Sequence, residues 1–214
     1  MAKRRKVGNL LALAILATLA EKPRHPYEMA SVMRERSTDS SIKIRWGSLY
    51  TVVQNLEKHA FIQATGTTRQ GSRPERTVYS VTEAGRAELG DWLTELIGTP
   101  EPELTRFEAG LTLLGILPPD RAQALLAERA RVLDEQIAIA KAGLASAADV
   151  PRIFLVEAEF RIAMTEAEAH WVRSLLTELE TGSLPGLDMW RQYHAGTPTT
   201  PDWAEWAEKG TPTD

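Results

Sequence analysis

The alternation of apolar and polar positions is clearest in residues 46–62. Four apolar residues recur there at spacings that place them on one face of a helix: Leu49, Val52, Val53 and Leu56. Ser48 precedes them and is a residue type that caps helix N-termini. The pattern predicts an amphipathic helix that starts after Ser48 and buries one face.

Two further helices are predicted before this one. Residues 7–21 are apolar on nearly every side, which is typical of a helix buried at the centre of a small domain. A shorter helix is predicted for about residues 27–37, because Pro26 already has the backbone angle of a first helical turn. Its inward face is expected to hold Tyr27, Ala30 and either Met33 or Val32.

Strand-forming residues follow the amphipathic helix. Residues 61–65 and 77–81 are rich in β-branched and aromatic side chains, and the loop between them contains Gly, Pro and three Arg. This composition predicts a β-hairpin. Residues 42–44 form a short extended piece that we expect to pair with the hairpin.

From residue 83 onward the pattern is helical. Helices are predicted for 83–97, about 103–116, 120–146 and 151–180, with a break at Gly98-Thr-Pro-Glu-Pro102. The first is expected to bury Leu89, Trp92, Leu93 and Leu96, and the second Leu104, Phe107, Leu111 and Leu114. Residues 182–214 are rich in Gly, Pro and Thr and are expected to be largely irregular, although Trp190, Trp203 and Trp206 indicate that part of this tail docks.

The two longest predicted helices each carry apolar residues that alternate by four and three positions. The seams are Leu126, Ala130, Leu133, Ile137, Ala140 and Leu144 in one helix, and Leu155, Ala158, Ile162, Thr165, Ala169, Val172, Leu176 and Leu179 in the other. Such helices can pack as an antiparallel hairpin, and a surplus face can pair with a second subunit. A monomeric helical bundle would show the same seams, so the periodicity leaves both arrangements open.

The polar face of the predicted helix after Ser48 has the chemistry of a DNA-reading surface. It carries Tyr50, Thr51, Gln54 and Lys58, with Asn55 on the flank. Gln and Asn can pair bidentately with adenine, and Thr, Tyr and Lys can reach base edges or phosphates. An ordinary solvated helix is the alternative, although such a face is usually richer in Glu.

The predicted hairpin loop adds basic residues to this surface. Arg69, Arg73 and Arg76 on such a loop can lie along a phosphate strand or enter a minor groove. A solubilising loop is the alternative, and Arg76 could instead pair with Glu75 or Glu83. The Lys3–Lys6 run is similarly open to two interpretations, an arm on DNA or a solvated terminus.

The distribution of charge supports the DNA interpretation although the net charge of −4 does not. Residues 1–86 contain 15 Lys and Arg against 7 Asp and Glu, whereas residues 87–214 contain 10 against 22. A basic N-terminal part on an acidic remainder indicates a local surface for a polyanion.

Composition excludes several other classes of protein. There is no Cys, so disulfides, thiol nucleophiles and Cys-ligated zinc are ruled out. The apolar run after the basic start is too short to span a bilayer and has no small-residue cleavage site, so we expect a cytoplasmic protein. The four His lie far apart, and His170 with Glu166 is a single pair of the kind usually found on helix surfaces. We therefore expect no metal, no cofactor and no enzymatic activity.

Several segments resemble the PadR family of bacterial transcriptional regulators. They are Leu11-Ala-Leu-Ala-Ile-Leu, His25-Pro-Tyr-Glu, Gly47-Ser-Leu-Tyr, Leu56-Glu-Lys and Arg73-Pro-Glu-Arg-Thr-Val-Tyr-Ser-Val-Thr-Glu-Ala-Gly-Arg. The resemblance spans residues 10–97 in the family's order. The helical remainder looks like the branch of the family with a virulence-activator-type C-terminal domain. This chain has Thr51 where the family usually has Pro, and His59-Ala60 where it usually has Asp-Gly.

The resemblance implies a fold and a division into domains. The expected fold is mainly α with a small β-wing: a winged helix-turn-helix domain in residues 1–82, a helical dimerisation domain in 83–181, and an irregular tail in 182–214. The implied function is that of a dimeric, sequence-specific DNA-binding regulator, a repressor of a nearby gene that acts on a dyad-symmetric operator. A transcriptional activator of the same fold, or a helical scaffold that binds another protein, is the alternative.

The same reasoning assigns roles to particular residues. The DNA-binding set is Lys43, Ser48, Tyr50, Thr51, Gln54, Asn55, Lys58, Arg69, Arg73 and Arg76. The dimerisation set, taken from the seams, is Leu126, Leu133, Ile137, Ile162, Ala169, Val172, Leu176 and Leu179. Similar proteins answer planar aromatic compounds, and Trp92 in the junction helix is the residue that we expect beside such an effector, with an ordinary core position as the alternative.

Overall fold

The computed structural model describes residues 5–36, 42, 44–68 and 76–196. The chain forms two compact units, residues 1–102 and residues 103–214, which are described separately. The elements of the first unit are α1 (Leu10–Glu21), α2 (Pro26–Glu35), the 3₁₀ turn η2 (Trp46–Ser48), α3 (Leu49–Lys58), β1 (Ile62–Thr68), β2 (Arg76–Val81) and α4 (Glu83–Gly98).

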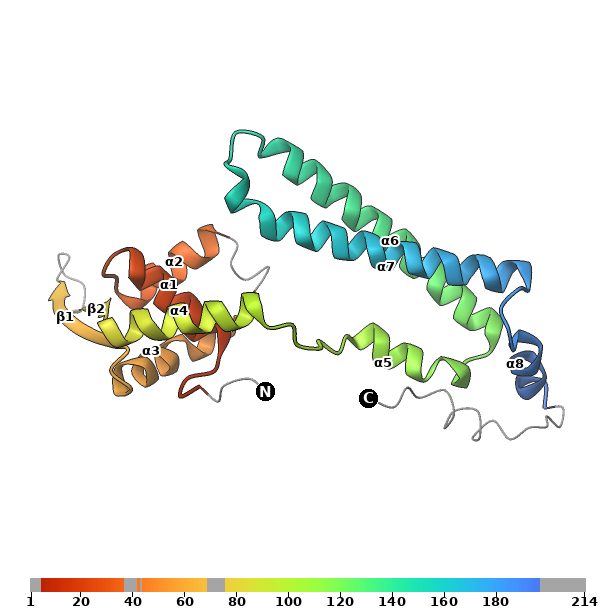
Figure 1. Ribbon diagram of the computed structural model, residues 1–214, viewed down its shortest axis with the longest axis horizontal. Helices are drawn as coiled ribbons and strands as arrows, with labels where there is room; N and C mark the ends of the chain where they lie inside the picture. Colours follow the sequence, from red (N-terminus) through yellow and green to blue (C-terminus); the bar gives the residue numbers. More distant parts are fainter. Residues whose placement is uncertain (1–4, 37–41, 43, 69–75, 197–214) are drawn as a thin grey trace. The chain divides into compact units, whose positions relative to one another are not determined.

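Helix α1 is the centre of the first unit. Eight of its twelve residues are buried, and Ile15 and Leu16 are completely inaccessible. It packs against α2, α3, β2 and α4 (Figure 1). The expectation of a central buried helix is therefore confirmed, with the helix beginning at Leu10, after Asn9 caps its first turn by accepting from the Leu11 amide at 2.7 Å.

Helix α3 buries the apolar stripe that its sequence predicts. Leu49, Val52, Val53 and Leu56 are all buried in the core of the first unit. The prediction that Ser48 caps this helix is wrong, because its hydroxyl donates to the Arg45 carbonyl at 2.8 Å and makes no cap bond. The 3₁₀ turn η2 runs directly into α3, so the backbone at Ser48 is already helical and lacks the extended geometry of a capping residue.

The end of α3 is a Schellman motif with an unusual residue at its left-handed position. The Phe61 amide donates to the Leu56 carbonyl at 2.9 Å, and the Ala60 amide donates to Glu57 at 2.8 Å. Ala60 has φ of 58°, a conformation that favours Gly. The end of α7 has the same pair of bonds, and there Gly182 occupies the left-handed position with φ of 72°.

This comparison predicts that Ala60→Gly stabilises the first unit. The substitution relieves left-handed strain, and the greater freedom of Gly in the unfolded chain offsets part of the gain, so we expect about 0.5–1 kcal/mol. Thermal denaturation of the full chain measures the effect. Gly182→Ala is the reciprocal control and should lower stability by a similar amount, and a melting temperature that Ala60→Gly leaves unchanged or lowers would contradict the argument.

The hairpin forms as predicted, but its third partner differs from the expected one. Strands β1 and β2 pair antiparallel with Ile62 opposite Val81, and the register shifts between Ala64 and Gly66. Arg24, between α1 and α2, pairs with Tyr79 through amide-to-carbonyl bonds of 3.1 and 3.0 Å. Of residues 42–44, expected in that place, Ile42 and Ile44 are described and neither lies in a strand. Arg24 can pair with the free edge of β2 because its buried guanidinium donates to the Thr18 carbonyl and to Glu21. These two bonds fix the Arg24 backbone beside β2.

Helix α4 belongs to the first unit, which moves the boundary expected after residue 82. Trp92 is 5% exposed in the core built around α1, and Leu89 packs against that core. At the helix start, the Thr82 hydroxyl accepts from the Gly85 amide at 3.0 Å and donates to the Ala60 carbonyl at 2.7 Å. The division between units therefore falls after Pro102, at the break of residues 98–102.

The C-terminal turns of α4 do not follow the predicted burial. Leu93 is 41% exposed and Leu96 is 50% exposed, although both were expected in the core. Exposure rises along the helix to Ile97, where the first unit offers no further packing surface.

The second unit is a long helical hairpin with short helices at its base. Its elements are α5 (Arg106–Thr112), the 3₁₀ turn η3 (Leu114–Ile116), α6 (Pro119–Ser146), the 3₁₀ turn η4 (Arg152–Phe154), α7 (Val156–Thr181) and α8 (Leu187–His194). Helices α6 and α7 lie side by side (Figure 1). One core cluster contains the predicted seam residues Leu126, Ala130, Leu133, Ala169, Val172, Leu176 and Leu179, with Ile137 packed against it. The remaining seam residues lie outside this cluster: Ile162 is buried, and Ala140, Leu144, Leu155, Ala158 and Thr165 are partly buried. The helix expected over 103–116 is shorter than predicted, and Leu104 lies before it as an exposed residue.

The described part of the tail contains a helix where we expected irregular chain. In α8, Trp190 is buried and its indole Nε1 donates to the Leu117 carbonyl at 2.8 Å. His194 Nε2 lies 3.0 Å from the Gly115 carbonyl oxygen. Helix α8 therefore contacts two backbone carbonyl groups in and just after η3, of the kind that the end of a helix leaves without an intrahelical partner. The expectation that part of the tail docks is confirmed for Trp190, whereas Trp203 and Trp206 lie outside the described residues.

Candidate nucleic-acid interface

The outward face of α3 presents the polar residues that were expected to read DNA. Tyr50, Thr51, Gln54, Asn55 and Lys58 are all exposed, and Tyr50 is 63% exposed. The buried stripe of the same helix fixes their direction, because Leu49, Val52, Val53 and Leu56 hold the opposite face of α3 in the core. Ser48, also in the predicted set, is partly buried and its hydroxyl is engaged with Arg45.

Residues before α3 add two cations that the sequence interpretation did not select. Arg45 is exposed immediately before η2. On α2, the Arg34 guanidinium lies 4.2 Å from the centre of the Trp46 ring, a cation–π contact that ties the end of α2 to the start of α3. The entrance to α3 is therefore both basic and held in place.

The basic residues predicted for DNA in the segment before α3 and in the wing remain predictions. Lys43, Arg69 and Arg73 lie outside the described residues. Arg76 is described only by its backbone, which begins β2 opposite Thr68. The pairing of β1 with β2 is described as far as Thr68 opposite Arg76, the two residues between which the loop lies.

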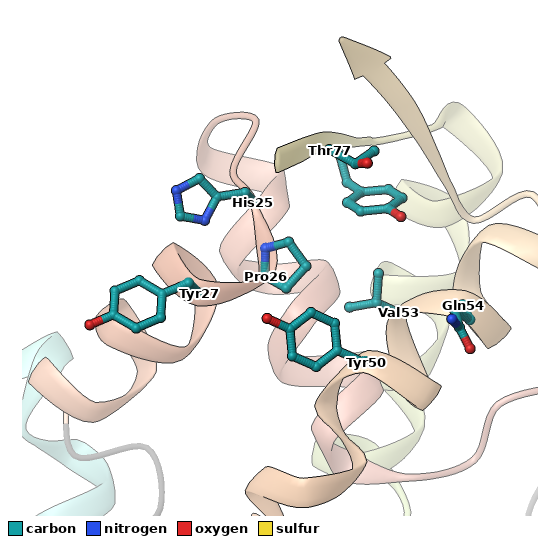
Figure 2. A pocket seen from close by; sticks show the side chains of 8 residues that line it. His25, Pro26, Tyr27, Tyr50, Val53, Gln54 and Thr77 are labelled. Carbon is teal, nitrogen blue, oxygen red and sulfur yellow. The ribbon is translucent and has the colours of Figure 1, made fainter. Parts of the chain in front are cut away.

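A cavity of about 350 Å³, which we call the notch, lies between α2, α3 and the wing. Figure 2 shows its lining: His25, Pro26, Tyr27, Tyr50, Val53, Gln54, Thr77 and Tyr79. Its floor includes Val53 from the core, and the Tyr50 ring stands at its mouth. Burial, followed by an interaction with the Glu57 carboxylate, raises the pKa of the Tyr79 phenol.

Tyr27 lies at the rim of the notch, although we had expected it on the buried face of its helix. It is 63% exposed, whereas Met29, Ala30 and Met33 form the inward face of α2. The cause is the start of the helix: His25 Nδ1 accepts from the Glu28 amide at 3.2 Å, and the Glu28 carboxylate accepts from the His25 amide at 3.1 Å. This capping box begins α2 at Pro26 and turns residue 27 outward.

Trp92 is a core residue of the first unit, and its expected place beside an effector stays a prediction. Its ring is buried, and the Arg5 guanidinium lies 5.0 Å from the ring centre. The same guanidinium pairs with Glu88 at 2.8 Å, with Asp91 at 3.5 Å and with Glu95. Arg5 is thus anchored to α4, which contradicts the interpretation of that residue as part of a solvated terminus.

An open, mostly apolar cavity lies between α1, α2 and α4, and Trp92 does not line it. It has a volume of about 250 Å³ and is lined by Leu13, Ala14, Ala17, Thr18, Val32, Met33, Arg36, Ile42, Leu89 and Leu93. Its walls come from α1, α2 and α4, so it is a better candidate than the Trp92 ring for a small apolar ligand.

The predicted dimerisation residues are used inside a single chain. Leu126, Leu133, Ala169, Val172, Leu176 and Leu179 form the core between α6 and α7, Ile137 packs against it, and Ile162 is buried. A side chain that fills its own hairpin offers no surface to another subunit. The same helix α7 has a second, exposed apolar stripe, at spacings of four, four and seven: Val156, Phe160, Met164 and Trp171.

In the described part of the chain, no group of three His, Cys, Asp or Glu side chains is placed to hold a metal ion. No helix among those residues has the length and apolar character needed to cross a bilayer.

Comparisons with known proteins agree with this geometry. Residues 15–91 match the PadR-like family of transcriptional regulators. A probable transcriptional regulator of Mycobacterium tuberculosis is 33% identical over 93 residues, which span 42% of this chain and 46% of that protein. The chain thus spans less than half the length of this curated relative.

Solved structures share the fold over most of the chain. Bacillus subtilis PadR bound to operator DNA superimposes with a TM-score of 0.64 at 20% identity, over 80% of this chain and 99% of that one. The same protein bound to p-coumaric acid gives 0.65 at 18% identity, with the same coverage. The virulence activator AphA of Vibrio cholerae gives 0.58 at 19% identity, over 80% of this chain and 98% of that one. The mainly helical fold with a small wing is confirmed.

Proposed function

Because the chain belongs to the PadR-like family of DNA-binding transcriptional regulators, we propose that it is a homodimeric repressor that reads a dyad-symmetric operator with α3. The observation that carries this proposal is the outward face of α3, where amide, hydroxyl and ammonium groups are exposed on a helix fixed by its buried stripe. Such a helix fits the major groove, and its amides match the donor and acceptor pattern of adenine.

We assign different tasks to different parts of this surface. Gln54 and Asn55 would contact base edges, whereas Lys58 at the last turn of α3 and Arg45 at its entrance would contact phosphates. The wing arginines Arg69, Arg73 and Arg76 would lie along a neighbouring phosphate strand or in the minor groove. Action on the nucleoid in the cytoplasm follows from this proposal.

The test compares Gln54→Ala with Lys58→Ala on a duplex selected by the full chain from a random-sequence pool. Gln54→Ala should lose about 1–3 kcal/mol of discrimination against a scrambled duplex, because a base contact disappears. Lys58→Ala should weaken both duplexes alike and lower the salt slope by about one, because a phosphate contact disappears. Unchanged discrimination in Gln54→Ala would disprove the assignment of the base-reading face.

The dimer would form through the second stripe of α7. Val156, Phe160, Met164 and Trp171 expose apolar surface on one side of α7, and Ile153 and Phe154 in the preceding η4 turn are also exposed. Contiguous exposed apolar surface of this kind marks an interaction site. A two-fold dimer would place half-sites about one helical turn of DNA, ~10 bp, or a multiple of it apart. If the chain selected no duplex, this stripe would instead favour the helical-scaffold alternative.

Release by a small aromatic effector is the remaining part of the proposal. The apolar cavity between α1, α2 and α4 supports it, since a ligand there would contact α4, which leads out of the first unit. The structure of Bacillus subtilis PadR with p-coumaric acid shows such a compound on a protein of this fold. Lower affinity for the selected duplex in the presence of an aromatic carboxylic acid would support this step, and unchanged affinity would count against it.

A further inference from the structure

We infer that the notch holds one sugar–phosphate strand of the bound DNA, with the Tyr50 hydroxyl donating to a phosphate oxygen. The inference rests on the proposed function and adds a contact that positions the protein without reading sequence. It is carried by a cavity on the recognition face, by the elements that border it, and by the chemistry of its lining.

The position of the notch follows from the order of elements around it. Helix α3 forms one side through Tyr50, Val53 and Gln54, and strand β2 forms the other through Thr77 and Tyr79. In the proposed complex, α3 enters a major groove and the wing meets the adjacent minor groove. One sugar–phosphate strand separates two adjacent grooves, so this strand has to cross the gap between α3 and β2.

The third side of the notch is the beginning of α2. His25, Pro26 and Tyr27 line it, and α2 has ten residues, so the positive end of its dipole is directed at the gap. The Glu28 carboxylate, which follows these residues, accepts from the His25 amide, and the Glu57 carboxylate interacts with Tyr79. None of the eight lining residues carries a formal negative charge, which suits the passage of a phosphate.

The tyrosines of the notch have different tasks. Burial and the Glu57 carboxylate raise the pKa of Tyr79, whereas Tyr50 is 63% exposed and its hydroxyl is directed toward Pro26 (Figure 2). Tyr27 stands at the rim on the other side of Pro26. A phenol donates one hydrogen bond and adds no charge, so a contact through Tyr50 fixes register without changing the number of released counterions.

The test uses the full chain, the selected duplex and the variant Tyr50→Phe. Loss of a hydrogen bond to a charged phosphate should weaken binding about tenfold. The loss should be equal on the selected and the scrambled duplex, and the salt slope should not change. Tyr193→Phe, the same chemical change in α8, is the control and should bind like the unaltered chain. Thermal denaturation should show that Tyr50→Phe folds normally, because this side chain is mostly exposed.

A second measurement locates the contact on the DNA. Phosphates of the selected duplex are replaced one at a time by neutral methylphosphonates. The unaltered chain should lose affinity at one position or two neighbouring positions on the strand between the two grooves, and Tyr50→Phe should be insensitive at the same place. Full affinity in Tyr50→Phe, a loss confined to the selected sequence, or unaltered sensitivity to the methylphosphonates would overturn the inference while leaving the proposed function intact. Failure of the unaltered chain to bind any duplex would overturn both.

Discussion

Val172→Glu is expected to unfold the second unit rather than to separate two subunits. Val172 is completely inaccessible between α6 and α7, in the cluster that contains Leu126, Leu133 and Leu176. A carboxylate at this position has no partner among those side chains and would have to be buried with its charge or protonated. The expected loss is at least about 3 kcal/mol, a large part of the stability of a domain of this size. Circular dichroism during thermal denaturation measures it.

Phe160→Glu provides the matched control on the same helix. Phe160 is 66% exposed, so the new carboxylate stays in water and the hairpin should keep its helical content. If the exposed stripe of α7 is the dimer face, sedimentation velocity should show this variant as a folded monomer at concentrations where the unaltered chain is a dimer. A fully folded Val172→Glu protein would contradict the described packing, and a monomeric unaltered chain would contradict the proposed dimer.

Gly85→Ala should destabilise the first unit by roughly 3 kcal/mol, near the upper end for one added methyl group in a packed interior. A Cβ at this position would lie 2.9 Å from the Phe61 carbonyl carbon and 2.9 Å from Val81 Cγ2, and it would overlap the Phe61 carbonyl oxygen. Backbone cannot move aside as a flexible side chain can, so α4 would have to shift away from the end of α3. Chemical denaturation of the full chain, followed by far-ultraviolet circular dichroism, measures the change.

The control is Gly90→Ala, in the same helix and five residues closer to its C-terminus. Nothing lies within 4 Å of a Cβ at residue 90, so this variant should gain about 1 kcal/mol from the better helix propensity of Ala. Opposite signs for the two substitutions would separate a clash at residue 85 from a general effect of Ala in α4. Equal effects would show that α4 does not approach Phe61 as described.

Local periodicity was sufficient to predict α3 and the two long helices. The stripe of Leu49, Val52, Val53 and Leu56 depends only on residues one turn apart, so it is visible in the sequence and is buried in the structure. The seams of α6 and α7 were equally visible, but the sequence did not show which helix each seam packs against. A repeat of fours and threes shows that a face is covered, and it does not distinguish a neighbouring helix of the same chain from a helix of another chain.

The features that sequence reasoning missed depend on contacts between distant segments. The notch brings together residues 25–27, 50–54 and 77–79, and no spacing within one segment reveals it. Arg5 reaches α4 across more than eighty residues, and Arg24 takes the edge of the wing from a loop between helices. Tyr27 had a partial indication in the sequence, since the inward spacing of Met29, Ala30 and Met33 places residue 27 to the side of the buried face. Helix α8 was missed because Gly and Pro before it give the tail the composition of irregular chain.

The hydroxyl of Thr82 has a mechanical consequence for the first unit. It joins the Ala60 carbonyl, just after α3, to the Gly85 amide in the first turn of α4, and the Thr82 amide itself donates to the Phe61 carbonyl at 3.0 Å. These hydrogen bonds hold the start of α4 in a fixed position relative to the end of α3. The two helices can therefore tilt together as one rigid element. A helix of 16 residues is about 24 Å long, so a tilt of about 5° at one end corresponds to roughly 2 Å at the other. A modest rotation of the free end of α4 would then be transmitted to α3 as a change in its angle of entry into DNA, while the hydrogen bonds within the first unit stay in place.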